Sequence, residues 1–79
     1  MNRQQLKLIL ECEGIRTDAY DLDGGHESEQ YVLRETHGLW SVFYSERGIE
    51  SGTRTFAVES DACEYLLQLL REDVSTHTR

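Results

Sequence analysis

The chain has 79 residues, enough for one hydrophobic core, and we expect a single domain over residues 1–79. Fifteen acidic residues against eight basic ones give a formal net charge of −7. A surface of that sign repels phosphate backbones and anionic lipid and attracts basic protein surfaces, so we expect no nucleic-acid and no membrane partner. The chain shows no signal-peptide pattern and no apolar run of the ~18 residues needed to span a bilayer, which favours a cytoplasmic protein.

The first segment has the periodicity of an amphipathic helix. Leu6 and Leu10 lie four residues apart and would share one helix face. Asn2 is suited to cap the beginning of this helix, and Gly14 is suited to end it. The sequence therefore predicts a helix over residues 2–13.

A short edge strand and an exposed turn follow. Tyr20 and Leu22 alternate with Asp21, which predicts a strand at 19–22. Residues 23–29 combine two glycines with acidic residues and contain no apolar side chain, the composition of a turn between strands.

Two longer strands are predicted at 30–36 and 39–45, joined by a tight turn at 37–38. The second of them carries Trp40 on one face and Phe43 on the other. Because both faces are apolar, we expect this strand to be central in the sheet.

The remainder of the sheet is expected to be a loop at 46–52 and a last strand at 53–58. Phe56 is the apolar anchor of that strand, within an alternation of threonine with larger side chains.

The C-terminal segment is predicted to form a leucine-rich helix. Ser60 or Asp61 would cap it, and Asp61 and Glu64 have the spacing of a capping box. The helical periodicity continues to Arg71, and we expect the tail at 72–79 to fray. The expected buried stripe comprises Ala62, Tyr65, Leu66, Leu67, Leu69 and Leu70.

These elements predict an α+β fold: a helix, a three- or four-stranded antiparallel meander, and a second helix, with both helices on one sheet face. An antiparallel sheet is expected because each linker is shorter than the dozen or so residues of a parallel crossover. The uncovered face would then expose Phe43 or Trp40, and such an apolar patch is typical of a surface that meets a partner or a second copy.

The residues that could carry chemistry are not arranged for it. His26, His37 and His77 lack the spacing of metal ligands. Cys12 and Cys63 fall within predicted helices, where a cysteine packs as a small apolar residue. We therefore expect no metal, no cofactor and no enzymatic activity.

A resemblance is carried by the C-terminal half. It consists of WSVFYSERG at 40–48, Phe56, and ESDACEYLL at 59–67. Together these stretches resemble small bacterial immunity proteins encoded beside polymorphic toxins. The resemblance implies a protein that neutralises a cognate toxin by binding its active site or an adjacent surface, without catalysis of its own.

Two groups of residues are candidates for contact with such a toxin. The acidic group comprises Asp18, Asp21, Asp23, Glu27 and Glu29. The group around the second loop comprises Tyr44, Glu46, Arg47 and Glu50. We expect the acidic residues to accelerate association with a basic toxin surface, and Tyr44 to hold the complex together.

Two other functions remain open at this point. One is an acidic nucleic-acid mimic or small regulatory adaptor that occupies a DNA-binding protein. The arginines interleaved with the acids at positions 16, 34, 47 and 54 weaken such mimicry. The other is a homodimeric interaction domain that has no toxin partner.

Overall fold

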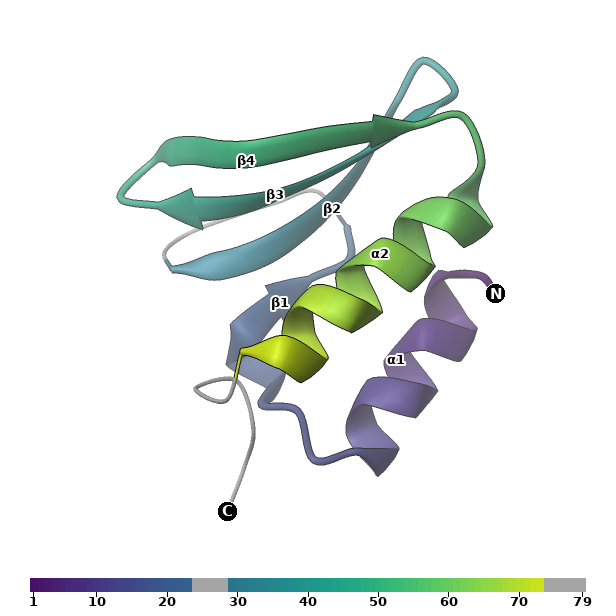
Figure 1. The fold of residues 1–79 in the computed structure, drawn as a ribbon, viewed down its shortest axis with the longest axis vertical. Coiled ribbons are helices and arrows are strands. Elements are labelled where there is room, and N and C mark those ends of the chain that lie inside the picture. The colour runs from purple at the N-terminus through teal and green to yellow at the C-terminus, as the bar shows by residue number, and fades with distance from the viewer. Residues whose placement is uncertain (24–28, 74–79) are drawn as a thin grey trace.

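The computed structural model describes residues 1–23 and 29–73 (Figure 1). Its elements are α1 (Arg3–Cys12), the 3-10 turn η1 (Thr17–Ala19), β1 (Tyr20–Asp21), β2 (Gln30–Thr36), β3 (Leu39–Glu46), β4 (Ile49–Phe56) and α2 (Glu59–Glu72). The predicted α+β class, with a sheet between two helices in the sequence, is confirmed. Both helices lie on one side of the sheet, α2 against the strands and α1 beside α2.

The sheet has the strand order β1, β2, β3, β4, and its last three strands form the predicted antiparallel meander. The first pair differs from the prediction, because β1 runs parallel to β2 with Tyr20 opposite Tyr31. A parallel connection usually needs a dozen or more residues, because the chain must travel back along the whole length of the first strand before the second begins. Since β1 has only two residues, the distance to travel back is short and fewer residues are enough.

Both antiparallel hairpins turn in two residues with positive φ angles. His37 and Gly38 have φ of 53° and 83°, and Arg47 and Gly48 have φ of 53° and 82°. Two such residues characterise the type I′ turn, whose twist matches that of paired strands. The loop expected at 46–52 was therefore wrong, because β4 begins directly after Gly48.

A β-bulge interrupts the pairing of β3 with β4. Gly52 and Thr53 together lie opposite the single residue Phe43, and Gly52 has φ of 65°. The extra residue resets the alternation of side chains along β4. Ser51 and Arg54, on either side of the bulge, consequently project from the same sheet face.

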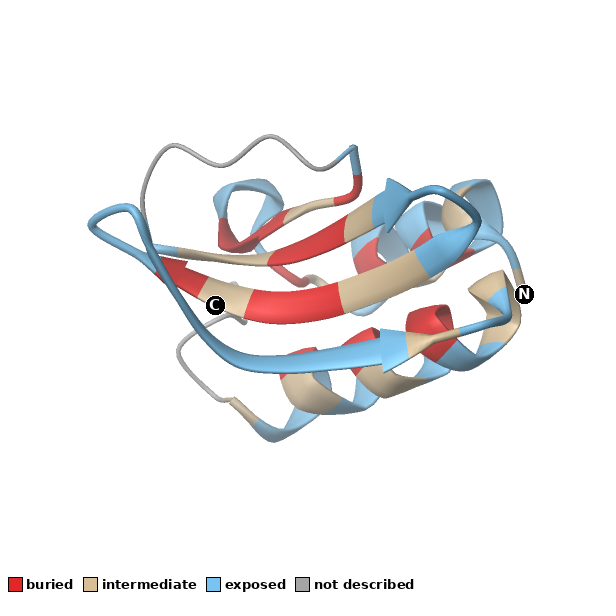
Figure 2. Ribbon diagram, turned by 90° about the horizontal axis from the view of Figure 1, so that it is seen from above, coloured by how far each residue is buried: buried red, intermediate tan, exposed pale blue. Residues whose placement is uncertain are grey.

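The core fills the space between the sheet and the two helices. Figure 2 shows its buried residues in red on the strands and on both helices. Its fully buried leucines come from α1, β2 and α2, so that each layer contributes. They are Leu6, Leu10, Leu33, Leu66 and Leu70. The stripe predicted for the closing helix is confirmed, with Tyr65 and Leu69 partly buried at its margin.

The far face of the sheet does not expose the apolar patch that the sequence suggested. Phe43 is 1% exposed, and the guanidinium of Arg34 lies 4.8 Å from the centre of its ring. Arg34 is held there by Glu50 at 3.0 Å. Trp40 lies on the helix side of the sheet instead, where it packs against the core with Arg3 at 5.3 Å from its ring. On the far face, the stem and guanidinium of Arg34 cover the ring of Phe43.

The beginning of α1 confirms its predicted cap. The Asn2 side chain accepts a hydrogen bond from the Gln5 backbone N–H at 2.9 Å, and the Gln5 side chain accepts one from Asn2 N–H at 3.0 Å. This reciprocal pair is a capping box. Gly14, with φ of 74°, follows the helix as expected.

The beginning of α2 differs from the prediction. The helix begins at Glu59, and Val58 at the N-cap makes no side-chain capping bond, so neither Ser60 nor Asp61 is the cap. Glu59 is engaged in the tertiary structure, because its carboxylate accepts a hydrogen bond from the backbone N–H of Arg3 at 3.0 Å. The contact joins the beginnings of the two helices.

The second helix ends at Glu72, so the first residue of the tail predicted at 72–79 is helical, and the helix is one residue longer than expected. The fraying expected for the remainder concerns residues 74–79, which lie outside the described residues. Within residues 1–23 and 29–73, no helix combines the length and apolar character needed to cross a membrane.

Candidate functional site

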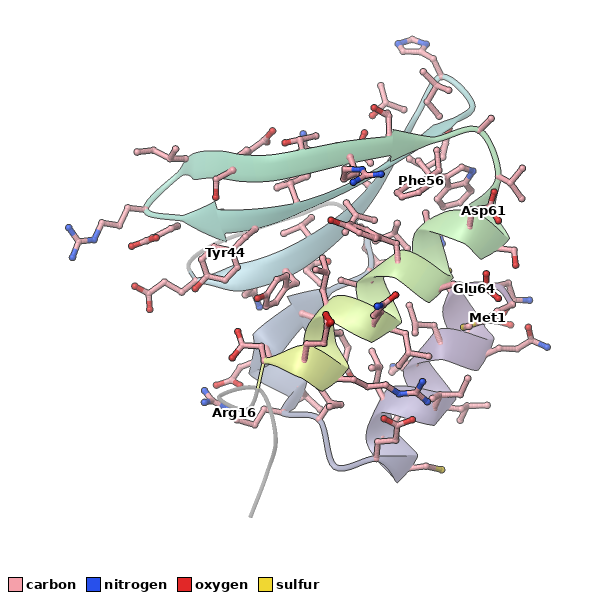
Figure 3. The ribbon with its side chains drawn as sticks, viewed as in Figure 1. Met1, Arg16, Tyr44, Phe56, Asp61 and Glu64 are labelled. Atoms are coloured by element: carbon pink, nitrogen blue, oxygen red, sulfur yellow. The ribbon has the colours of Figure 1, made fainter. Side chains whose placement is uncertain are left out.

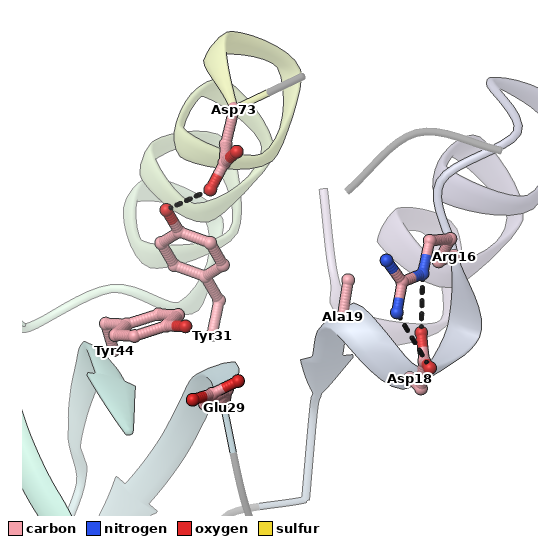
Figure 4. Close-up of a pocket in the computed structure, with 7 residues that line it drawn as sticks. All are labelled: Arg16, Asp18, Ala19, Glu29, Tyr31, Tyr44 and Asp73. Atoms are coloured by element: carbon pink, nitrogen blue, oxygen red, sulfur yellow. Dashed lines mark hydrogen bonds and ion pairs between the residues drawn. The ribbon is translucent and has the colours of Figure 1, made fainter. Parts of the chain in front are cut away.

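A hollow of about 140 Å³ opens where the start of β2, the end of β3 and the end of α2 converge (Figure 4). Its lining residues are Arg16, Asp18, Ala19, Glu29, Tyr31, Tyr44 and Asp73. They come from segments that are distant in the sequence, so the hollow exists only in the folded chain. In Figure 3, Tyr44 and Arg16 lie on the left side of the molecule, and Phe56 and Asp61 on the right side.

Two tyrosines form one wall of this hollow. Tyr31 and Tyr44 are directly paired across β2 and β3, and their rings meet edge to face with centroids 4.9 Å apart. The Tyr31 hydroxyl donates a hydrogen bond of 2.9 Å to Asp73 Oδ2. Burial, together with this bond and the Asp73 charge, raises the pKa of Tyr31 to about 12. Tyr31 is therefore a neutral donor that is fixed in place at physiological pH.

Carboxylates surround the tyrosines. Burial raises the pKa of Tyr44, and the charges of Glu29, Glu46 and Asp73 raise it further. These carboxylates create a negative potential at the tyrosine. That potential disfavours a phenolate and attracts a cation to the same place. The second tyrosine thus stands in an acidic field.

Arg16 and Asp18 form a local ion pair at the rim. The guanidinium donates two hydrogen bonds of 3.0 Å to the carboxylate, and this interaction lowers the pKa of Asp18. The pair is internally neutral, so the negative character of the hollow comes mainly from Glu29 and Asp73.

Of the residues predicted to contact a partner, the structure gathers Asp18, Glu29 and Tyr44 around the hollow, with Glu46 near Tyr44. Sequence reasoning missed Tyr31. It lies as far before the tight turn at 37–38 as Tyr44 lies after it, so the turn itself could have paired the two tyrosines.

Arg16 and Asp73 were also missed as members of this site. Arg16 was noted only as a cation among the acids. Asp73 fell in the predicted tail, and no local pattern signals that the end of α2 returns to β2.

Two predicted residues lie elsewhere. Asp21 accepts a hydrogen bond from the backbone N–H of Asp23 at 2.8 Å, and Asp23 lies 3.7 Å from Arg3. They line a separate hollow of about 190 Å³ with Lys7 and Tyr20. The acidic run of the sequence is thus divided between two places, and Glu27 lies outside the described residues.

The remaining two predicted residues also lie apart from the tyrosines. Arg47 is exposed at the tip of the second hairpin. Glu50 projects from the opposite face of the sheet, where it pairs with Arg34 at 3.0 Å. Neither residue lines the tyrosine hollow.

The hollow combines aromatic rings with carboxylates. In the part of the chain that is described, no group of three or more His, Cys, Asp and Glu side chains is placed to hold a metal ion. Both cysteines are free thiols, and burial raises the pKa of Cys63 to about 11, so that it is a neutral thiol. An aromatic wall among carboxylates is instead suited to a guanidinium or ammonium group.

Comparison with known proteins gave no matching family model, no matching curated protein and no matching solved structure. The fold and the site define a small acidic α+β protein with a tyrosine-walled hollow on its surface.

Proposed function

We propose that this chain is a cytoplasmic immunity protein that binds and neutralises a cognate bacterial toxin, by occluding the active site of the toxin or an adjacent surface. The observation that carries the proposal is the Tyr31–Tyr44 pair, set among Glu29, Asp18 and Asp73 in one hollow. The resemblance of the C-terminal half to immunity proteins supports the same function.

The tyrosine pair is suited to anchor a complex. Tyr44 is half-buried, so it offers ring surface to a partner while its backbone is fixed in β3. Tyrosine is enriched among the residues that dominate interface energetics, because a rigid ring provides a large contact area at low entropic cost. The hydrogen bond to Asp73 favours one orientation of the Tyr31 ring.

The carboxylates are suited to make binding selective for a basic partner. Glu29, Glu46 and Asp73 act on the same place, and the chain as a whole carries a net charge of −7. A toxin that presents a basic, phosphate-binding cleft would be steered toward this end of the molecule. The step that inhibits the toxin is occlusion, which requires no catalysis by this chain.

Acidic mimicry of nucleic acid has less support. Four carboxylates that could stand in for phosphates are engaged with arginines: Glu13 with Arg71, Asp18 with Arg16, Asp23 with Arg3, and Glu50 with Arg34. A mimic needs an uninterrupted row of negative charge, and these pairs interrupt it.

The test is co-expression of the tagged chain with the product of the gene immediately upstream. The proposal predicts that the two proteins co-purify and that the chain restores growth to cells expressing that product. Tyr44→Ala should weaken both effects. Leu8→Ala is the matched control, because Leu8 is 63% exposed on α1, away from the hollow. If the native chain shows no co-purification and no rescue of growth, the proposal is contradicted.

A further inference from the structure

The outer edge of the sheet is a long, exposed strand. In the described part of the chain, β4 is last in the strand order, and seven of its eight residues are exposed. Ile49, at its beginning, is 68% exposed. The outward N–H and C=O groups of such an edge are a template for another strand.

The bulge restricts which strand can pair with this edge. In a regular strand, residues three apart lie on opposite faces. Ser51 and Arg54 of β4 lie on the same face, because the bulge falls between them. A regular partner strand would therefore match the faces of β4 on only one side of the bulge.

We propose that β4 pairs antiparallel with β4 of a second copy, centred between Gly52 and Thr53. This register places the two bulges opposite each other, so the faces match along the whole edge. Ile49 then lies opposite Phe56 of the second copy on the helix side, and Glu50 lies opposite Thr55 on the other side. The arrangement has the two-fold, self-complementary character of a dimer interface.

The apolar contact would bury a residue that the single chain leaves exposed. Phe56 is half-buried, and its ring packs against Tyr65 with centroids 5.4 Å apart. Ile49 of one copy would extend this aromatic pair in the other. By symmetry, the contact occurs at both ends of the paired strands.

The ends of the pair are also complementary in charge. Because Ile49 lies opposite Phe56, the hairpin tip that carries Arg47 in one copy lies at the same end of the paired strands as the beginning of α2 in the other. The first turn of α2 carries Glu59 and Asp61. An exposed arginine at each hairpin tip would thus lie near an acidic helix beginning, which offsets part of the repulsion between two acidic chains.

The dimer is independent of the proposed immunity function. The tyrosine hollow is lined from the segment before β1, from β2 and β3 and from the end of α2, and no β4 residue lines it. It would remain open in both copies. Failure of dimerisation and failure of toxin binding would therefore be separate results.

Sedimentation equilibrium of the full chain over a range of concentrations tests the proposal. A reversible monomer–dimer equilibrium is expected, and Ile49→Lys should raise the dissociation constant by ~10-fold or more. Leu8→Lys, at a similarly exposed leucine on α1, should leave it unchanged. Circular dichroism of each variant checks that the fold is retained.

A charge exchange locates the interface. Arg47→Glu and Asp61→Arg should each weaken the dimer, and the double variant should recover affinity, because the two opposite charges lie at the same end of the paired strands. A chain that sediments as a monomer at every concentration would overturn the proposal. A dimer that is insensitive to Ile49→Lys, or equally sensitive to Leu8→Lys, would do so as well.

Discussion

The hydroxyl of Tyr31 donates a 2.9 Å hydrogen bond to Asp73, and thereby joins β2 to the residue that ends α2. Both residues line the hollow, so the contact holds two parts of its wall together. The stability of the fold and the shape of the proposed binding site are therefore linked at this position.

Removing this hydroxyl should destabilise the chain. Tyr31→Phe keeps the ring contact with Tyr44 and loses the bond to Asp73, so we expect a loss of ~1 kcal/mol in the free energy of unfolding at pH 7. Urea unfolding measures it. Tyr44→Phe keeps the same ring pair, and its effect should stay within ~0.5 kcal/mol. Equal effects of the two changes would contradict the role assigned to the Tyr31 bond.

The same residue predicts a dependence on alkaline pH. The pKa of Tyr31 is about 12 in the folded chain, against ~10 for an unfolded tyrosine. Between these values the unfolded chain has released a proton that the folded chain retains, so stability falls as pH rises. The contribution is complete below pH ~10 and is lost by pH ~12. Unfolding free energies of native and Tyr31→Phe chains across this window should show a smaller decline in the variant.

The far face of the sheet should be as sensitive as the core. Phe43 is 1% exposed, and Phe43→Ala should cost ~3–5 kcal/mol. Because a chain of this size has a total stability of only ~3–5 kcal/mol, the variant should be largely unfolded by circular dichroism. Leu39→Ala, on the same strand at 50% exposure, is the control and should remain folded. A folded Phe43→Ala chain would contradict the core-like contribution assigned to Phe43.

The beginning of α2 offers a stabilising change. Val58 occupies the N-cap with extended backbone and makes no capping bond. Val58→Ser supplies a hydroxyl acceptor there, and we expect a gain of ~0.5–1 kcal/mol in thermal or urea unfolding. The converse change, Asn2→Ala, removes the cap that α1 possesses and should cost ~1 kcal/mol. A loss of stability in Val58→Ser would show that the valine side chain matters more than the missing cap.

Local patterns predicted the elements that local physics determines. The α1 cap, the turn at His37–Gly38 and the apolar stripe of α2 each depend on residues within a few positions of one another. The second turn was predictable by the same rule, since Arg47–Gly48 resembles His37–Gly38: in each, a polar residue is followed by glycine between two strands. It was missed because the charged stretch around it resembled a loop.

Long-range features escaped sequence reasoning for a physical reason. The parallel pairing of β1, the covering of Phe43 by Arg34, and the return of Asp73 to Tyr31 are set by packing between distant segments. The acids Asp18 to Asp23 look like one group in the sequence. The chain divides them because Asp18 precedes the short strand β1 and Asp23 follows it.

Binding kinetics at low salt, measured between the chain and the toxin with which it co-purifies, test whether the tyrosine hollow is the toxin-binding site. If it is, Glu29→Lys slows association and Tyr44→Ala accelerates dissociation. Asp21→Lys combined with Asp23→Lys, which carries charge reversal outside the hollow, should affect association less. Unchanged kinetics in both Glu29→Lys and Tyr44→Ala would show that the toxin binds elsewhere on the molecule.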